Sequence, residues 1–177
     1  IIGDNPGTTL QHVVYPATAE NYAASTRNGS VEVQKMLRDN FETCPSTKIV
    51  LLAYSEGANA LGDALCGGGV LDVETVEPGQ GLGLTLAVVA IILWGDTRFN
   101  TSETFAAGTA HQNGLFPRPA NESCEYYAPR LQSYCDDNDM YCASGDSEEV
   151  HISYADRYNT KSLEFCELEI AEGKVDR

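Results

Sequence analysis

The sequence predicts an α/β domain built on a central parallel sheet, and three observations support this fold class. Residues 49–53 and 87–94 are short, wholly apolar runs, which is typical of strands covered on both faces. Segments with helical spacing lie between the strand candidates, so strands and helices alternate along the chain. The chain has 177 residues, 42% of them hydrophobic, without repeat or linker, which suits one domain over residues 1–177.

Turn residues and apolar spacing predict the elements of the N-terminal half. Residues 10–15 are a strand candidate closed by Pro16, and residues 22–29 are expected to be irregular. Ser30 is expected to cap a helix that runs to about Phe41 and ends before the next strand. A second helix is expected over residues 58–65, because apolar residues recur there at helical spacing and three glycines follow.

The C-terminal half predicts long loops, a short strand and a final helix. Residues 70–83 and 99–127 contain glycines and prolines and are expected to be loops. Residues 131–134 are expected to form a short strand, and residues 154–173 a helix. The apolar residues of this helix are expected to face inward; they are Tyr158, Leu163, Phe165, Leu168 and Ile170.

The charge of the chain argues against nucleic acids and anionic membranes as partners. The formal net charge is −15 at pH 7, and such a surface repels both kinds of partner. No apolar run approaches the roughly 18 residues that a membrane span requires. A neutral or weakly charged substrate fits this surface better than a polyanion.

Cysteines and glycosylation sequons indicate a secreted protein. The six cysteines lack a paired C-x-x-C and the three histidines lie far apart, so neither a metal site nor a cofactor is expected. Sequons begin at Asn28, Asn100 and Asn121. Together these features favour an extracellular, disulfide-bonded protein. Because no signal peptide is visible at Ile1, a mature or processed chain is expected.

A strand, a tight turn with a serine and a helix follow one another around Ser55. The motif reads A-x-S-x-G from Ala53 to Gly57, close to the G-x-S-x-G of a nucleophile elbow, where small neighbours let strand and helix approach. The alternative is a serine that simply caps a helix after a buried strand. The elbow would make Ser55 a nucleophile, with histidine and carboxylate partners later in the chain.

His151 is the better placed of the two histidines that follow Ser55. It lies in a polar loop directly before the last helix, whereas His111 lies in a long irregular loop and is expected at the surface. Several carboxylates precede His151 and could orient it. The residues themselves leave the choice open among Asp96, Asp136, Asp137, Asp139, Asp146, Glu148 and Glu149.

Four stretches carry a resemblance to a known family. They are CPSTKIVLLAYSEG at residues 44–57, ALCGGG at 64–69, LWGDTRF at 93–99, and SYCDDNDMYC with VHISY within 133–154. The chain resembles the cutinase and acetylxylan esterase family, carbohydrate esterase family 5, and looks closer to the fungal acetylxylan esterases. The resemblance implies a small, secreted, lidless α/β-hydrolase with a three-layer sandwich around a parallel sheet.

The resemblance also assigns roles to particular residues. It implies Ser55 as nucleophile, His151 as general base and Asp139 as the carboxylate that orients the histidine. The backbone N–H of Glu56, where the family usually has glutamine, would be an oxyanion donor. The implied disulfides are Cys135–Cys142 and Cys66–Cys124.

The family pattern begins with a strand, and we expect this chain to start after it. We expect that strand to lie in an N-terminal peptide or second chain linked through Cys44, or to have been removed. A third alternative is that Cys44 and Cys166 pair with each other in a rearranged fold.

The expected function is that of a secreted serine esterase, most simply acting on acetyl groups of xylan. The alternative enzyme is a cutinase or short-chain lipolytic esterase, whose substrate is an aliphatic polyester. The alternative of another class is a non-catalytic binding or effector protein that kept the fold. Tyr54, Phe99 and Phe116 are the candidate substrate-binding residues.

Overall fold

The computed structural model describes residues 1–71, 75, 77–78 and 87–173. Most of the loop predicted over residues 70–83 therefore lies outside the described residues. Within the described part of the chain, no helix is long and apolar enough to span a membrane.

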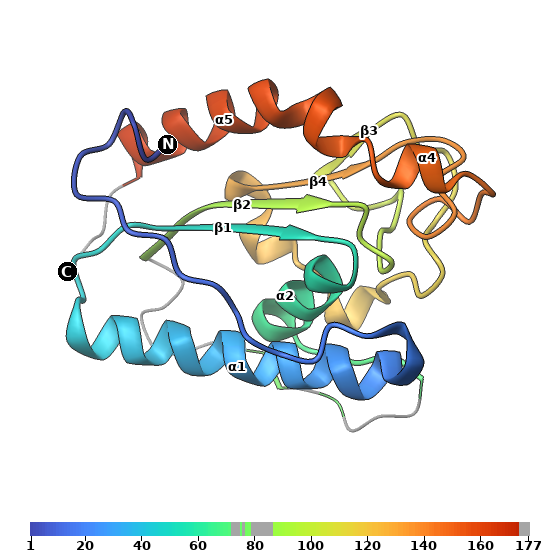
Figure 1. Cartoon of the computed structure of the whole chain (residues 1–177), viewed down its shortest axis with the longest axis horizontal. Helices are drawn as coiled ribbons and strands as arrows, with labels where there is room; N and C mark the ends of the chain where they lie inside the picture. The colour runs from blue at the N-terminus through green and yellow to red at the C-terminus, as the bar shows by residue number, and fades with distance from the viewer. Residues whose placement is uncertain (72–74, 76, 79–86, 174–177) are drawn as a thin grey trace.

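In the described part of the chain, a parallel four-stranded sheet lies between helices on its two faces (Figure 1), so the predicted three-layer α/β arrangement is confirmed. The strand order is β1-β2-β4-β3. Helices α1 and α2 cover one face and α5 covers the other. The strands are β1 (Ile49–Tyr54), β2 (Val88–Trp94), β3 (Ala106–Gly108) and β4 (Leu131–Cys135). The α-helices are α1 (Tyr22–Thr43), α2 (Glu56–Cys66), α4 (Glu148–His151) and α5 (Tyr154–Glu172), and the 3₁₀ helices are Ala19–Asn21, Ala120–Glu122 and Glu125–Arg130.

Strand β2 forms the centre of the core, as its apolar sequence predicts. Alternate side chains of a strand point to opposite faces, and here both faces are covered. Ile91 and Leu93 join the cluster beneath α1 and α2, whereas Ile92 joins the cluster that contains Tyr154 and Cys166 of α5. The continuous apolar run of β2 therefore reflects burial on both sides.

Strand β1 is less covered than its sequence predicts. Its Leu52 side chain is 53% exposed, because β1 lies at one edge of the sheet. The strand predicted over residues 10–15 is wrong: this segment is irregular, and Val14 is 83% exposed. A strand needs a neighbour to pair its backbone groups. In the described structure this segment instead ends at Tyr15, whose ring lies against Gly29 of α1.

Helix α1 begins nine residues earlier than predicted, at Tyr22 with Asn21 in the cap position. Residues 22–29 are rich in poor helix formers, which favoured irregular structure. In the structure the hydroxyls of Thr26 and Ser30 donate to carbonyls one turn earlier, so these side chains are satisfied within the helix. Gly29 lets α2 approach closely, since a Cβ there would lie 3.0 Å from the Ala60 Cβ. Tertiary packing against α2 therefore outweighs the low local propensity.

Helix α5 lies where predicted, and Tyr158 and Phe165 pack against the core as expected, but its most buried residues differ from the predicted ones. Leu168, expected to face inward, is 61% exposed. The buried residues Tyr154, Ser162 and Cys166 follow the four-residue spacing of one helix face. This face meets the sheet, which turns Leu168 toward solvent. The loop predicted over residues 99–127 also contains the short strand β3. A strand of three residues is too short to show a recognisable pattern in the sequence.

Two disulfides form, Cys66–Cys124 and Cys135–Cys142, the pairs that the family resemblance implied. Cys44 is an exposed free thiol and Cys166 a buried one. The alternative in which these two cysteines bond to each other is therefore wrong for this structure. Burial raises the pKa of the Cys166 thiol to about 11.

Candidate active site

Ser55 lies at the turn between β1 and α2, at the carboxyl end of the sheet. Its backbone is in an unusual conformation, with φ 54° and ψ −122°, a region that non-glycine residues rarely occupy. The turn is held by the Ser55 N–H, which donates to the Trp94 carbonyl of β2 at 2.8 Å. The Ser55 Oγ lies 2.8 Å from the His151 Nε2. This is the local geometry of a nucleophile elbow.

His151 is the last residue of α4, a one-turn helix capped by the Ser147 hydroxyl. Its Nδ1 lies 2.8 Å from the Asp139 Oδ2. The ring packs against Gly95, which has φ +62°, and a Cβ at this position would lie 2.8 Å from the His151 Cε1. A glycine after β2 therefore leaves the space that the imidazole occupies.

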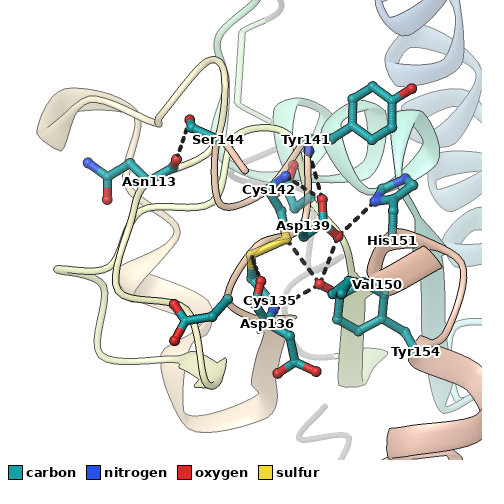
Figure 2. Close-up of a disulfide and its surroundings, with 12 residues drawn as sticks. Asn113, Cys135, Asp136, Asp139, Tyr141, Cys142, Ser144, Val150, His151 and Tyr154 are labelled. Carbon is teal, nitrogen blue, oxygen red and sulfur yellow. Dashed lines mark hydrogen bonds and ion pairs between the residues drawn. A yellow bond between two sulfur atoms is a disulfide. The ribbon is translucent and has the colours of Figure 1, made fainter. Parts of the chain in front are cut away.

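Asp139 lies inside the loop that the Cys135–Cys142 disulfide closes, and its carboxylate accepts hydrogen bonds from four donors (Figure 2). Its Oδ1 accepts hydrogen bonds from the Tyr141 N–H at 2.7 Å and the Cys142 N–H at 2.9 Å. Its Oδ2 accepts from the His151 ring and from the Tyr154 hydroxyl, each at 2.8 Å. Burial alone would raise the pKa of this carboxyl, but the hydrogen bonds from His151 and the other donors outweigh it and lower the pKa. Asp139 is thereby kept as a carboxylate facing the imidazole.

Tyr154, the first residue of α5, is a part of the site that the sequence did not reveal. Its hydroxyl donates to Asp139 and accepts from the Asp136 N–H at 2.9 Å. The side chain is fully buried, and burial raises the pKa of its phenol. The only available signal was a tyrosine three residues after the histidine, and this spacing carries no chemical meaning before the fold is known.

The other candidate carboxylates have different partners. Asp136 is buried but accepts hydrogen bonds from Thr109, Arg157 and Tyr158. Burial raises the pKa of Asp96, and its Oδ1 accepts from the Arg98 N–H. The remaining candidates occupy the exposed loop and α4; they are Asp137, Asp146, Glu148 and Glu149. Among the described residues, Asp139 is the carboxylate that contacts the His151 ring. His111 is exposed, as predicted, and lies near Asp137.

The three predicted substrate-binding residues lie in different environments. The Tyr54 hydroxyl donates to the His151 carbonyl, so this residue supports the histidine backbone. Phe99 is 4% exposed and belongs to the core cluster beneath α5. Its predicted contact with substrate does not fit this burial, because the surrounding core packing already covers the ring. Phe116 is half-buried, and its ring centroid lies 5.8 Å from that of Tyr22.

A buried ionic cluster anchors α2 through Asp63. The Asp63 Oδ1 accepts from the guanidinium groups of Arg98 at 2.6 Å and Arg118 at 2.9 Å. Arg98 also contacts Glu122, and the Asp63 Oδ2 accepts from the Asn59 amide at 2.8 Å. Because both arginines lie in the long segment after β2, the cluster fixes that segment against the helix that follows Ser55.

The three sequon asparagines differ in accessibility. Asn28 is exposed on α1, although Ser30 of the same sequon is buried and bonded to the Ala60 carbonyl. Asn121 is exposed in a 3₁₀ helix. Asn100 is half-buried, and its amide nitrogen donates to the Arg118 carbonyl at 2.9 Å.

A parallel sheet with a serine at a strand–helix turn, followed in the chain by a carboxylate and then a histidine, defines an α/β-hydrolase. Comparison with known proteins identifies the family within this class. The chain belongs to the Cutinase family, whose family model matches residues 2–170.

The chain is similar to proteins named acetylxylan esterase. It is 33% identical to the acetylxylan esterase of Hypocrea jecorina over 98% of this chain and 60% of that protein. It is 32% identical to acetylxylan esterase 2 of Talaromyces purpureogenus over 96% of this chain and 76% of that protein. The structure matches the catalytic core domain of acetyl xylan esterase from Trichoderma reesei with a TM-score of 0.87 and 34% identity, covering 95% of this chain and 85% of that one. The chain thus spans about 60% of the length of the Hypocrea jecorina protein.

Proposed function

We propose that this chain is a serine carboxylesterase in which Ser55 is the nucleophile, His151 the general base and Asp139 the residue that orients the base. The observation that carries the proposal is the pair of 2.8 Å contacts that links the three side chains. With Nδ1 donating to the Asp139 carboxylate, Nε2 is free to accept the proton of the Ser55 hydroxyl. The low pKa of Asp139 and its four donors support this role.

The reaction then follows from the positions of these groups. The Ser55 Oγ attacks the ester carbonyl while the His151 Nε2 takes its proton. The Glu56 N–H, in the first turn of α2, has no partner within the helix and would stabilise the oxyanion. His151 returns the proton to the leaving alcohol, and a water molecule activated by the same ring releases the acid from Ser55.

We propose acetyl groups of xylan as the substrate, because two relatives with at least 32% identity are named acetylxylan esterases. A cutinase is the second candidate, since the chain is 32% identical to cutinase 11 of Verticillium dahliae, of which it covers 61%. A series of p-nitrophenyl esters separates the two. Activity confined to acetate supports the deacetylase, and an optimum at butyrate or longer chains supports the cutinase.

We further propose that residues 1–177 form one catalytic domain of a secreted glycoprotein. Two disulfides support an oxidising compartment, and the exposed Asn28 and Asn121 are the more accessible glycan sites.

Labelling with a fluorophosphonate tests the proposed nucleophile. The native chain should form an adduct on Ser55, whereas Ser55→Ala and heat-denatured protein should not. Loss of p-nitrophenyl acetate hydrolysis in Ser55→Ala completes the test. A folded native chain without adduct and without hydrolysis would instead support the non-catalytic alternative.

A further inference from the structure

The aromatic ring of Tyr141 lies against the imidazole of His151. The two ring centroids are 4.5 Å apart and the ring planes meet at 60°, which is the geometry of an attractive edge-to-face aromatic pair. Figure 2 shows the Tyr141 ring beside the imidazole, with its hydroxyl directed away from it. The contact with His151 is therefore made by the ring of Tyr141 and not by its hydroxyl.

This ring contact limits a motion of the imidazole that the hydrogen bonds of the candidate triad leave free. The torsion that tilts a histidine ring about its bond to Cβ has a broad energy minimum, so the tilt depends on what the ring packs against. Of the three tyrosine rings near the imidazole, that of Tyr141 is the nearest, because those of Tyr54 and Tyr154 lie at centroid distances of 5.4 Å and 6.4 Å. We therefore take Tyr141 as the aromatic residue that defines the tilt.

The backbone of Tyr141 is fixed independently of its side chain. Its N–H donates to the Asp139 Oδ1 at 2.7 Å, and its carbonyl accepts from the Leu115 N–H at 3.0 Å. The next residue, Cys142, closes the loop through its disulfide with Cys135. The half-buried side chain of Tyr141 thus extends from an anchored loop, and a substitution that changes only this side chain leaves the backbone hydrogen bond to Asp139 in place.

We propose that Tyr141 is a positioning residue whose ring holds the imidazole at the tilt at which Nε2 passes the proton of Ser55 to the leaving alcohol. The inference rests on the proposed esterase function and extends it to the step in which the C–O bond of the ester breaks. In this step the proton that His151 took from the Ser55 Oγ moves from Nε2 to the leaving oxygen, the carbonyl re-forms, and the acyl group stays on Ser55.

The proposal predicts a dependence on the leaving group. An alkoxide is a poor leaving group and needs the proton from Nε2, whereas p-nitrophenolate is stable as an anion and leaves without it. An imidazole that has lost its fixed tilt should therefore slow the cleavage of alcohol esters more than the cleavage of p-nitrophenyl esters.

Two acetate esters of similar shape, p-nitrobenzyl acetate and p-nitrophenyl acetate, test this prediction. The ratio of their kcat/KM values is measured for the parent, Tyr141→Leu and Tyr141→Phe. This ratio reports the acylation step, and a loss of folded protein cancels from it because both esters are affected equally. We expect Tyr141→Leu to lower the benzyl-to-phenyl ratio about tenfold. Tyr141→Phe keeps the ring and should retain the ratio of the parent.

Tyr126→Leu is the matched control, because it removes the same side chain from another edge-to-face pair. Tyr126 is 56% exposed in the 3₁₀ helix Glu125–Arg130, and its ring centroid lies 5.2 Å from that of Tyr127. Its ratio should equal that of the parent. Tyr141→Met, with a flexible side chain, is a second variant in case Tyr141→Leu fails to fold, and it should lower the ratio in the same way.

The proposal is overturned if the leucine and methionine variants lower kcat/KM equally for both esters or leave it unchanged, and this result leaves the esterase function intact. A ratio in Tyr141→Phe as low as in Tyr141→Leu would assign the effect to the hydroxyl and overturn the proposal as well. So would an equal shift in Tyr126→Leu. A parent that hydrolyses only p-nitrophenyl acetate overturns the inference alone, whereas a folded parent that hydrolyses neither ester overturns both the inference and the proposed function.

Discussion

Replacing Tyr154 with phenylalanine should weaken both the fold and the candidate active site. The substitution keeps the buried ring and removes the hydroxyl that donates to Asp139 at 2.8 Å and accepts from the Asp136 N–H at 2.9 Å. A hydrogen bond to a charged group contributes about 1.5–3 kcal/mol, and a buried donor left without partner costs about 1–3 kcal/mol. We expect Tyr154→Phe to lower the free energy of unfolding by about 3 kcal/mol and the melting temperature by roughly 9 °C.

Part of this loss should depend on pH, with a sign that follows from Asp139. The folded-state pKa of Asp139 is lowered. Its carboxylate therefore stabilises the fold fully above the ordinary carboxyl pKa of about 4. This contribution is lost as the pH falls through the folded-state pKa. Without the Tyr154 donor, the folded-state pKa rises toward the ordinary value. The deficit of the variant should therefore be full at pH 7 and should shrink to about half at pH 3.

Urea unfolding at pH 7 and pH 3 measures both parts, and kinetics with p-nitrophenyl acetate at pH 7 measures the effect on the site. We expect kcat to fall about tenfold with little change in KM, because Asp139 keeps its two backbone donors but loses part of its orientation. Tyr134→Phe is the control, since the Tyr134 hydroxyl donates to the neutral Gln132 amide oxygen; its deficit should not change with pH. A Tyr154→Phe deficit that is equal at both pH values would refute the role assigned to this hydroxyl.

Three further substitutions test the supports of the candidate site. Gly95→Ala places a Cβ 2.8 Å from the His151 Cε1 at a residue with φ +62°, so the imidazole must move and kcat/KM for p-nitrophenyl acetate should fall about 100-fold; an unchanged kcat/KM would contradict the packing described. Asp63→Asn removes the carboxylate charge between two buried arginines and should lower the free energy of unfolding by about 3 kcal/mol in urea titrations. Glu122→Gln should lower the free energy of unfolding by only about 1 kcal/mol, because Glu122 is 20% exposed. Equal losses in Asp63→Asn and Glu122→Gln would argue against the cluster as the anchor of α2.

The local sequence pattern was sufficient to predict an element where its burial follows the residue spacing within that element. The apolar run of β2 is buried on both faces. The small residues on either side of Ser55 correctly indicated a tight turn in which Ser55 has a positive φ. The same reasoning failed where a segment needed a distant partner. Residues 10–15 have strand-like composition but no neighbouring strand in the described structure, and residues 22–29 have poor helix propensity but pack on α2.

By itself the sequence determined the alternation of strands and helices, the position of the serine turn and the order of the candidate triad residues. The residues alone left seven carboxylates open, and the family resemblance was needed to choose Asp139. Only the tertiary structure decided which groups meet: the Asp139 carboxylate with the His151 ring, and the Tyr154 hydroxyl behind them. The reason is physical. Periodicity along the chain records how each element is buried, whereas hydrogen bonds between distant residues depend on how those elements pack against one another.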